Sequence, residues 1–467
     1  MSGALIAVFK SQRGFATVPV APVSVYAYVT GATTAGVTFI AQGDGGSTIT
    51  SYVATSTPGS ITGTLSQAGS GTISVSGLTT GTAYTFTIHA VNAIGNSAES
   101  VASNSITYVG ILYSCGYNNV GQLGVGDVTL RSSPTAVGAT TNWLTGSAGY
   151  FHRSGIRTDG TIWCWGGNTD GELGTNNTTN YSSPVQVGAL TTWASVNTGY
   201  KVTHAVKTDG TLWAWGNNVK GQLGDGTTID RSSPVQIGAL TTWTETSSDG
   251  NVTASVATDG TLWTWGDCSG GLCGLGNGTR YSSPKQVGAL TTWATVSVGW
   301  AHTLATQTDG TLWAYGKNTA GQLGLGNTTS PYSSPVQVGA LTTWLAAAAG
   351  RYFSMAIKTD GTIWSWGSNN TGQLGINNTT YKSSPVQVGA LTTWLSTSLS
   401  TGHGNTGATV GTNVADARLY CWGNNFQGSL GDGTGFNRSS PVQIGSKTDW
   451  IGTVTQYAYG TAAISNS

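Results

Sequence analysis

One unit of about 50 residues recurs through the C-terminal three-quarters of this 467-residue chain. The glycine that closes a Trp-x-Trp-Gly element, or a variant of it, falls at Gly116, Gly166, Gly216, Gly266, Gly316, Gly367 and Gly423. Successive glycines are 50, 50, 50, 50, 51 and 56 residues apart. A fixed period of this length indicates a repeat architecture, in which each copy forms one unit that buries its apolar face against the next.

Residues 208–243 show what one copy encodes. Asp209-Gly210 predicts a tight hairpin turn, because this pair tolerates the positive φ that such turns need. The alternation in 212–215 is typical of a strand, and Pro234-Val-Gln-Ile predicts another strand at an edge. Trp243 begins a further strand, and no segment shows a helical period. About four strands per copy is the pattern of a β-propeller blade, so the sequence predicts a seven-bladed propeller.

The two ends of the repeat array complement each other. The first copy begins late, at Ile111, and has no Asp-Gly hairpin before it, while the last ends early, after Trp450 and a strand over 460–464. We therefore expect the C-terminal tail to pair with residues 111–137 and to complete one blade. Closing the ring in this way removes exposed strand edges.

The repeated run Thr208-Asp-Gly-Thr-Leu-Trp-Ala-Trp-Gly-Asn-Asn, continued by Gly221-Gln-Leu-Gly, resembles the regulator of chromosome condensation repeat family. The resemblance covers residues 111–467 and implies the closed seven-bladed propeller. It also implies protein-binding roles, because founding members exchange nucleotide on a small GTPase and bind chromatin, and others inhibit β-lactamases. The sequence lacks the basic tail and the long projecting hairpin that the exchange factors use.

The N-terminal quarter divides into an arm and a small β-sandwich. Residues 19–108 resemble a fibronectin type III domain, in which Leu78 and Tyr84 match the buried leucine and the tyrosine corner and Phe39 replaces the usual core tryptophan. We expect three parts: an arm over 1–18, the sandwich over 19–108 and the propeller over 109–467. The arm is either a frayed terminus or an apolar anchor formed by Leu5, Ile6, Val8 and Phe9.

Charge is scarce in this all-β chain. Charged residues make up 8% of the sequence and the formal net charge is zero, against a usual charged share of about 25%. Nucleic-acid binding needs clustered Lys and Arg, so we expect no nucleic-acid partner. No apolar stretch reaches the ~18 residues that cross a bilayer, so we expect no membrane insertion.

No constellation of residues predicts catalysis, a cofactor or a metal. Asp209 and its counterparts in other copies recur as turn residues, and acids off the repeat, such as Asp249, are scattered singly. His152 and His302 share one column of the repeat. Histidine at two of seven positions cannot form a ring of metal ligands, so we expect these side chains to form hydrogen bonds within their blades. Five cysteines leave at least one without an intramolecular partner. Cys268 and Cys273 share a loop, where either a disulfide or two reduced thiols could occur, and reduced thiols are favoured.

Two columns depart from the repeat consensus and are candidate binding residues. One follows the glycine that ends each inner strand, and we expect it near the mouth of the central channel: Tyr150, Phe151, Tyr200, Lys201, Trp300, Arg351, Tyr352, His403, Tyr457 and Tyr459. Tyr, Trp and Arg are enriched at binding hot spots, although each aromatic could instead cap its own blade. The other column precedes Ser-Ser-Pro and is expected at the outer rim: Arg131, Tyr181, Arg231, Tyr281, Tyr332, Lys382 and Arg438. These residues either form a binding surface or stack between neighbouring blades through cation–π interactions.

The function predicted from these features is that of a non-enzymatic recognition protein. We expect a virion component, a phage tail or capsid decoration, whose arm docks into other virion proteins and whose propeller binds a host-surface protein or glycan. A secreted bacterial adhesin or protein inhibitor is the first alternative, and a GTPase exchange factor is the second. A polysaccharide-acting enzyme would need two close acids at the channel mouth.

Overall fold

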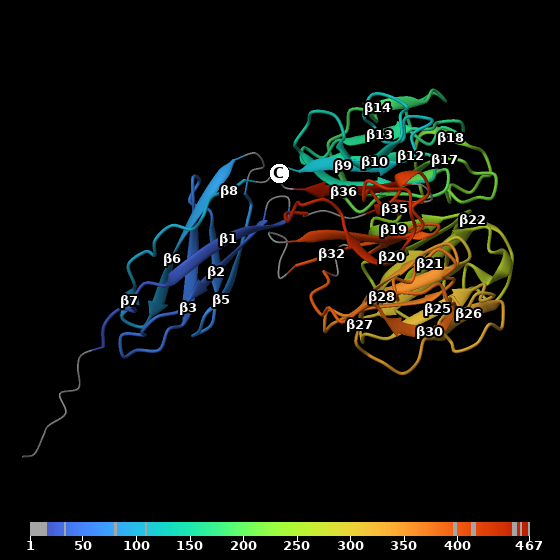
Figure 1. The fold of residues 1–467 in the computed structure, drawn as a ribbon. Coiled ribbons are helices and arrows are strands. Elements are labelled where there is room, and N and C mark those ends of the chain that lie inside the picture. The colour runs from blue at the N-terminus through green and yellow to red at the C-terminus, as the bar shows by residue number, and fades with distance from the viewer. Residues whose placement is uncertain are drawn as a thin grey trace, which may run out of the picture. The chain divides into compact units, whose positions relative to one another are not determined.

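The sequence folds into two units, divided between Tyr108 and Val109 (Figure 1). The computed structural model describes residues 16–31, 34–78, 82–107, 110–395, 399–411, 417–450, 455–457 and 460–465. Every regular element in these ranges is a strand, apart from two 3-10 turns at Ser269–Gly271 and Phe426–Gly428. The predicted all-β class is confirmed.

The first unit is a β-sandwich of two antiparallel sheets. One sheet has the order β1-β2-β5, and the other runs β4-β3-β6-β7 with β8 also paired to β6. Its core contains Leu78 and Tyr84, together with Phe39, whose ring lies 4.3 Å from that of Tyr52. The strands are β1 (Val23–Gly31), β2 (Thr34–Ile40), β3 (Ser51–Thr57), β4 (Thr62–Leu65), β5 (Gly71–Ser76), β6 (Ala83–Asn92), β7 (Gly95–Asn96) and β8 (Ile106–Thr107).

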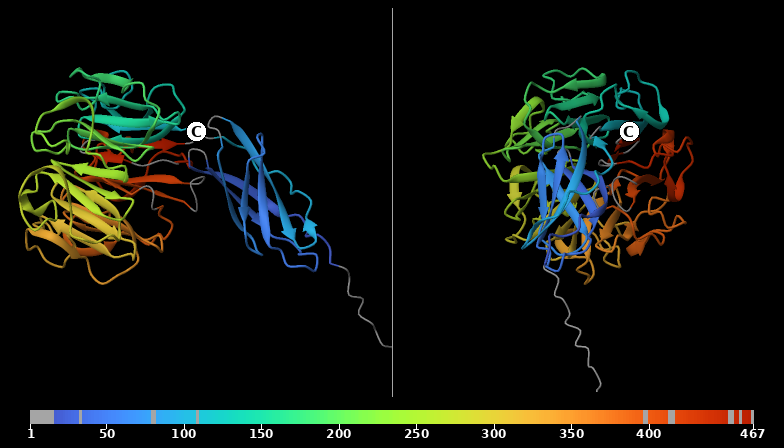
Figure 2. Two further views of the ribbon diagram at one scale, coloured as in Figure 1. Left: turned by 180° about the vertical axis from the view of Figure 1, so that it is seen from behind. Right: turned by 90° about the vertical axis from the view of Figure 1, so that its left-hand side faces the viewer.

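The second unit is a ring of seven four-stranded sheets, which we number as blades 1 to 7 (Figure 2). Blade 1 is formed by β9 (Ile111–Gly116), β10 (Arg131–Ala136), β35 (Thr455–Tyr457) and β36 (Gly460–Ser465). Blade 2 is formed by β11 (Trp143–Ala148), β12 (His152–Arg157), β13 (Ile162–Gly166) and β14 (Tyr181–Gln186). Blade 3 is formed by β15 (Trp193–Thr198), β16 (Val202–Lys207), β17 (Leu212–Gly216) and β18 (Arg231–Gln236).

Blades 4 to 7 repeat this order of strands. Blade 4 is formed by β19 (Trp243–Asp249), β20 (Val252–Ala257), β21 (Leu262–Gly266) and β22 (Tyr281–Gln286). Blade 5 is formed by β23 (Trp293–Val298), β24 (His302–Gln307), β25 (Leu312–Gly316) and β26 (Tyr332–Gln337). Blade 6 is formed by β27 (Trp344–Ala349), β28 (Phe353–Lys358), β29 (Ile363–Gly367) and β30 (Lys382–Gln387). Blade 7 is formed by β31 (Ser400–Thr401), β32 (Asn405–Val410), β33 (Arg418–Gly423) and β34 (Arg438–Gln443).

Blade 1 closes the ring with strands from both ends of the repeat array. Its order is β10-β9-β36-β35, so β9, early in the array, pairs antiparallel with β36, the last strand. The register places Gly460 opposite Gly116 and Ser465 opposite Ile111. Figure 1 shows this pair as a cyan strand beside a red one. The predicted pairing of the tail with the first copy is confirmed.

The Asp-Gly turns anchor the tryptophans that fill the space between blades. In blade 3, Asp209 Oδ1 accepts hydrogen bonds from the backbone N–H and the hydroxyl of Thr211, and the Trp213 indole donates to that hydroxyl. The same chain of contacts links Asp159, Asp259, Asp309 and Asp360 to their threonines and tryptophans. The hydrogen bonds from Thr211 hold the pKa of Asp209 below its usual range. The recurrent acids therefore stabilise turns.

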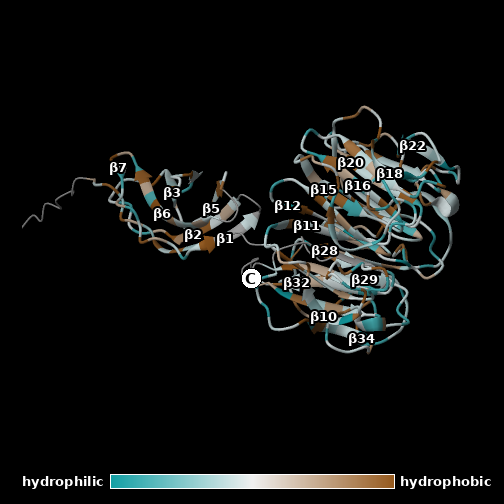
Figure 3. Ribbon diagram, turned by 90° about the horizontal axis from the view of Figure 1, so that it is seen from above, coloured by the Kyte–Doolittle hydropathy of each residue, from teal (hydrophilic) through white to brown (hydrophobic). Residues whose placement is uncertain are grey.

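Apolar residues gather along the strands of the blades, as the brown segments of Figure 3 show. Trp193, at the start of β15, is 3% exposed, and its ring lies 6.3 Å from that of Trp213 and 6.1 Å from that of Trp215. Similar edge contacts recur in other blades, for example between Trp344 and Trp364. Trp193, Trp215 and Trp344 are buried, and Trp213 and Trp364 are partly buried beside them, so these indoles form part of the apolar packing of the blades.

A compact loop between the third and fourth strands of each blade packs against the next blade. In blade 3 this loop contains Gly221, whose φ is +78°, and a Cβ added there would lie 2.7 Å from the Cα of Ser282 in blade 4. Glycine is required because the loop backbone presses directly against the neighbouring blade. The loop thus links local turn chemistry to the packing of the ring.

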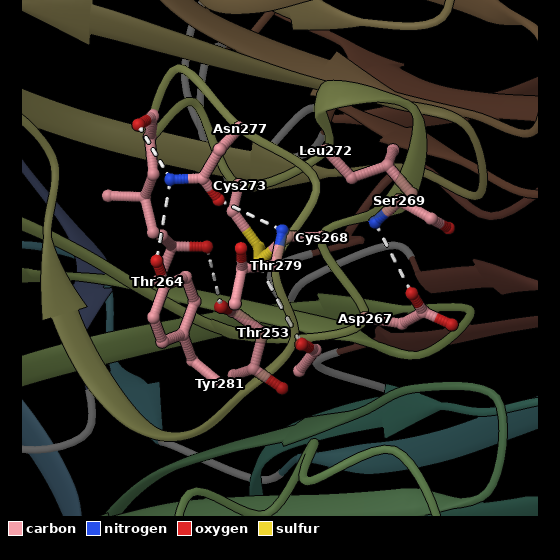
Figure 4. The surroundings of a disulfide bond; sticks show 12 residues. Thr253, Thr264, Asp267, Cys268, Ser269, Leu272, Cys273, Asn277, Thr279 and Tyr281 are labelled. Atoms are coloured by element: carbon pink, nitrogen blue, oxygen red, sulfur yellow. Dashed lines mark hydrogen bonds between the residues drawn. A yellow bond between two sulfur atoms is a disulfide. The ribbon is translucent and has the colours of Figure 1, made fainter.

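Six of these loops are held by a buried asparagine and one by a disulfide. The Oδ1 atom of each asparagine accepts the backbone N–H of the leucine five residues later at 2.9–3.0 Å, and its Nδ2 donates to a carbonyl nine residues later: Asn118, Asn168, Asn218, Asn318, Asn369 and Asn425. In blade 4 the same two positions are Cys268 and Cys273, which are bonded to each other (Figure 4). The expectation of reduced thiols is therefore wrong.

Candidate binding site at the channel mouth

The seven inner strands line a central channel, and the first strands of neighbouring blades contact one another around it. Four backbone N–H groups on these strands donate to a side chain of the preceding blade at 2.9–3.0 Å: Thr198 to Ser147, Ser248 to Asn197, Val298 to Ser247 and Ala349 to Ser297. These bonds hold the inner strands at one height. They also place the loops that follow those strands at the same end of the channel.

A polar cavity of about 140 Å³ lies between the ends of the inner strands. Its lining is dominated by hydroxyl groups, such as those of Ser147, Ser247 and Ser297, and includes the carboxylate of Asp249. Asp249 is 7% exposed and its Oδ1 lies 3.9 Å from His403 Nε2. The sequence pattern alone treats Asp249 as a scattered acid. The signal that could have found it is the loss of the glycine that ends the inner strand in other copies, since Asp249 stands at that position.

Four aromatic rings from four blades meet in the loops directly beyond this cavity. Tyr150 lies 4.9 Å from Tyr200 and 5.5 Å from His403, measured between ring centroids. Trp300 lies 5.3 Å from Tyr200 and 5.2 Å from His403. Each ring therefore contacts two others in a closed circuit, which we call the aromatic plug. Tilted and edge-on contacts of this kind contribute about 0.5–1.5 kcal/mol per pair beyond the area buried.

Cationic and further aromatic groups surround the plug. The Arg351 guanidinium lies 5.5 Å from the ring centroids of both Trp300 and Tyr352. Phe151 packs edge-on against Tyr150 at 4.3 Å. Lys201 Nζ donates to Asp170 Oδ2 at 2.6 Å, and this bond raises the pKa of Lys201 against the lowering effect of its partial burial.

Eight of the ten residues in the predicted channel-mouth column therefore occupy one end of the propeller. Five of them, Tyr150, Tyr200, Trp300, His403 and Arg351, contact others of the set across blade boundaries rather than capping only their own blades. The side chain of Tyr457, the whole of Tyr459, and the predicted anchor residues Leu5, Ile6, Val8 and Phe9 lie outside the described residues.

Residues of the predicted rim column are engaged within their own loops. The arginines pair with aspartates at 2.6–2.8 Å: Arg131 with Asp127, Arg231 with Asp225 and Arg438 with Asp432. The tyrosine hydroxyls contact asparagines at 3.3–3.5 Å: Tyr181 with Asn177, Tyr281 with Asn277 and Tyr332 with Asn327. Lys382 lies half-buried at the same position. Each of these arginines forms an ion pair within its own loop, and the cation–π contact recorded in this column, Lys285 over Tyr281 at 5.8 Å, lies within one blade rather than between neighbouring blades.

The buried acids of these pairs depend on their hydrogen bonds. Burial raises the pKa of Asp225, but hydrogen bonds from Thr227 and Arg231 outweigh burial and hold the pKa below its usual range. The aspartate–arginine and asparagine–tyrosine pairs thus perform one task, which is to brace the end of the loop. Blades 1, 3 and 7 have the charged aspartate–arginine pair at this position, and blades 2, 4 and 5 have the neutral asparagine–tyrosine pair.

The two histidines of the shared column connect blades rather than bonding within one. His152 Nε2 lies 2.9 Å from the Thr203 hydroxyl of blade 3, and His302 Nε2 lies 2.7 Å from the Ser354 hydroxyl of blade 6. Burial lowers the pKa of His152 to about 3, so it is neutral at pH 7. The expected bonding within the blade is wrong. No group of three His, Cys, Asp or Glu suited to a metal occurs among the residues that the structure describes.

No helix in the described part of the chain is long and apolar enough to cross a membrane.

Comparisons with known proteins agree with both units of the fold. The regulator of chromosome condensation (RCC1) repeat matches six segments, 159–206, 209–255, 259–306, 309–357, 360–408 and 416–462. A second form of this repeat matches 293–322 and 346–373, and the fibronectin type III domain matches 20–106.

Solved structures share the propeller at low sequence identity. Human WBSCR16 is 18% identical with a TM-score of 0.69, covering 77% of this chain and 99% of that one. Prp20p from Saccharomyces cerevisiae, studied for its binding to Gsp1p and histones, is 16% identical with a TM-score of 0.66, covering 77% and 92%. Yeast RCC1 (Prp20) bound to Kap60 gives the same identity and TM-score, covering 77% and 89%. These similarities concern the fold.

A curated relative is the human X-linked retinitis pigmentosa GTPase regulator. It is 29% identical over 107 residues, which is 22% of this chain. The chain spans about a tenth of the length of that relative, since the match covers 10% of it.

Proposed function

The chain belongs to the regulator of chromosome condensation repeat family, and we propose from this premise that it is a non-enzymatic recognition protein. Its propeller binds a macromolecular partner through the channel mouth. The observation that carries this proposal is the aromatic plug, where rings from four blades meet beside Arg351. Clustered Tyr, Trp and Arg side chains are the usual centre of a protein-binding surface.

The geometry of the channel end favours binding over catalysis. The cavity behind the plug is about 140 Å³, whereas pockets for small-molecule substrates are typically ~300–1,000 Å³. Among the described residues that line it, Asp249 is the one carboxylate, and glycoside hydrolysis by the usual route needs two. The four rings are only partly buried, so they present an outer surface at this end of the propeller. Such a surface suits contact with another protein.

Site-directed photo-crosslinking tests this proposal. A benzophenone amino acid at position 352, beside Arg351, is expected to form adducts with the binding partner. The control carries the same group at Leu345, a residue 46% exposed on β27. Adducts at 352 that disappear in Arg351→Ala, with none at 345, support the channel mouth. Equal adducts at both positions, or adducts at 345 alone, contradict it.

Regulation of a small GTPase is the second candidate, and similarity to a GTPase regulator favours it. The fold shared with Prp20p, whose binding to Gsp1p was studied, points the same way. The assay is release of a fluorescent guanine nucleotide from a panel of purified small GTPases. Accelerated release that is lost in Arg351→Ala supports exchange activity. Release at the intrinsic rate across the panel excludes the GTPases tested.

Display on a phage virion is the finer role predicted from the sequence. It rests on the low charge, the repeat similarity and the apolar arm over residues 1–18, and neither the family match nor the solved structures support it. The test is the size of native assemblies and of recombinant protein, with and without residues 1–18. Incorporation of the full chain alone into an assembly supports an anchor. Two monomeric forms contradict it.

A further inference from the structure

Away from the channel mouth, an equivalent hollow recurs between successive blades. Three copies measure about 560, 440 and 420 Å³ and lie between blades 2 and 3, blades 4 and 5, and blades 5 and 6. These volumes fall within the range typical of ligand pockets, ~300–1,000 Å³. We call them the inter-blade pockets.

The three pockets have the same construction. Between blades 4 and 5, Trp293 and Trp313 line the pocket together with the proline ring of Pro335. Leu290, Gln286 and Ser334 also line it. The same residue types stand at the corresponding positions in the other two pockets. Each pocket therefore combines an aromatic and apolar wall with an amide and a hydroxyl.

The pockets carry no charged lining residue. Lys207 Nζ lies 3.7 Å from the ring centroid of Trp213, and Lys358 Nζ lies 3.8 Å from that of Trp364. Neither lysine is among the residues that line its pocket. In the pocket between blades 4 and 5, the strand position equivalent to these lysines is Gln307, a neutral residue. The residues that line all three pockets are therefore uncharged, which is complementary to an uncharged ligand, and in two pockets a lysine stacks on the two lining indoles from outside the lining.

One leucine in each pocket has about half of its surface exposed to solvent. Leu190, Leu290 and Leu341 are 49%, 48% and 47% exposed. Each stands beside a tryptophan that is only 3–4% exposed, Trp193, Trp293 or Trp344. The exposed apolar surface thus borders a pocket with an aromatic floor, and contact with a ligand would cover it.

We propose that the inter-blade pockets bind a neutral polysaccharide. A pyranose ring has an apolar face suited to indole and proline surfaces, and hydroxyl groups suited to the glutamine amide and the serine. Pockets of the same construction, repeated around a ring, match a polymer that presents the same sugar at regular intervals. Each pocket binds weakly, and simultaneous occupation raises the overall affinity by a factor of about 10²–10⁴.

Affinity electrophoresis tests the proposal with defined polymers. The probes are dextran, a mixed-linkage β-glucan, a galactomannan and an arabinogalactan, with polygalacturonate and heparin as anionic comparisons. We expect at least one neutral polymer to retard the protein and its free monosaccharide to compete at least 100-fold more weakly. Retardation by the anionic polymers alone, or by none of the six, overturns the proposal.

Replacement of the exposed leucines locates the binding site. The triple variant Leu190→Ser, Leu290→Ser and Leu341→Ser is expected to weaken retardation at least tenfold, and each single variant less. The matched control is Leu345→Ser, which removes a leucine of similar exposure, 46%, that does not line a described pocket. Unchanged retardation in the triple variant overturns the assignment.

Two further measurements distinguish loss of the pockets from unfolding and from effects at the channel mouth. Circular dichroism and melting temperature establish that the leucine variants are folded. Arg351→Ala, at the channel mouth, is expected to leave retardation unchanged, so the pockets and the proposed protein-binding site fail independently. An apolar peptide that binds in a leucine-dependent way, with no polysaccharide retardation, contradicts a carbohydrate ligand and identifies a peptide groove.

Discussion

The loop of blade 4 and the corresponding loops of the other six blades reach the same result by different chemistry. In the six, a buried asparagine clamps the loop through hydrogen bonds, as Asn218 does with the Leu223 backbone N–H at 3.0 Å. In blade 4 a disulfide joins Cys268 and Cys273 at the same two positions. Both kinds of loop press a glycine against the next blade, Gly221 onto Ser282 and Gly271 onto Ser333.

The propeller therefore constrains the conformation of this loop, whereas the interaction that maintains the conformation can be either a set of hydrogen bonds or a disulfide. The asparagine satisfies buried backbone groups that would otherwise remain unpaired, and the disulfide restricts the loop covalently. Either solution is acceptable because the loop must reach the neighbouring blade in one conformation. Substitutions in these loops can separate the contributions of the hydrogen bonds and of the disulfide to the stability of the propeller.

The largest effect is expected from removing one asparagine clamp. Asn218→Ala leaves the Leu223 N–H and the Thr227 carbonyl without their side-chain partner in a buried site. We expect the free energy of unfolding to fall by about 3 kcal/mol, measured by denaturant titration. Thr228→Ala, at an exposed position in the same loop, is the control. An effect of Asn218→Ala no larger than that of the control would show that the clamp is dispensable.

The acid of the blade 2 loop makes that loop sensitive to pH. Glu172 stands where four other blades have a glutamine: Gln122, Gln222, Gln322 and Gln373. Burial raises the pKa of Glu172 to about 7 from an ordinary 4.5. Because the folded state holds this proton more tightly, stability falls as pH rises from about 4.5 to about 7. Glu172→Gln is expected to abolish this fall and to add on the order of 2 kcal/mol above pH 7. Parallel stability–pH curves for the two proteins would contradict this expectation.

Removing the disulfide is expected to destabilise blade 4 by a comparable amount. In the variant Cys268→Ser with Cys273→Ser, the unfolded chain gains the freedom of a short loop, worth about 2 kcal/mol. Dithiothreitol is expected to lower the melting temperature of the wild type and to leave the double variant unchanged. An equal effect of dithiothreitol on both proteins would show that it does not act through this disulfide. Cys115, Cys164 and Cys421 are free thiols in the described structure, so they offer the reductant no other disulfide.

The smallest effect is expected from exchanging one solution for the other. Cys268→Asn with Cys273→Leu places the asparagine clamp in blade 4, and stability is expected to stay within about 1 kcal/mol of the wild type, since a buried hydrogen-bond set replaces the covalent link. This variant is also expected to resist reductant. A loss as large as that of the serine pair would show that the blade 4 backbone differs from the others.

Several features of the site were accessible from the sequence and others were not. The repeat period aligned Tyr150, Tyr200, Trp300 and His403 in one column at one end of the blades. Their mutual contacts could not be predicted, because a period specifies the position within a blade and not the distance across the channel. The pairs such as Asp225 with Arg231 recur at short spacings in the chain and could have been recognised there.

The blade count, the ring closure and the turn chemistry could be predicted from the sequence, because hairpin turns and alternating strands are local features that recur with each repeat. The structure shows that Cys268 and Cys273, which share one loop, are bonded to each other. Packing between blades determines which rings form the aromatic plug and brings His152 and His302 to the next blade. Those outcomes depend on how seven nearly equal sheets pack around an axis. That packing brings together residues 50 or more positions apart, whose contacts no local pattern records.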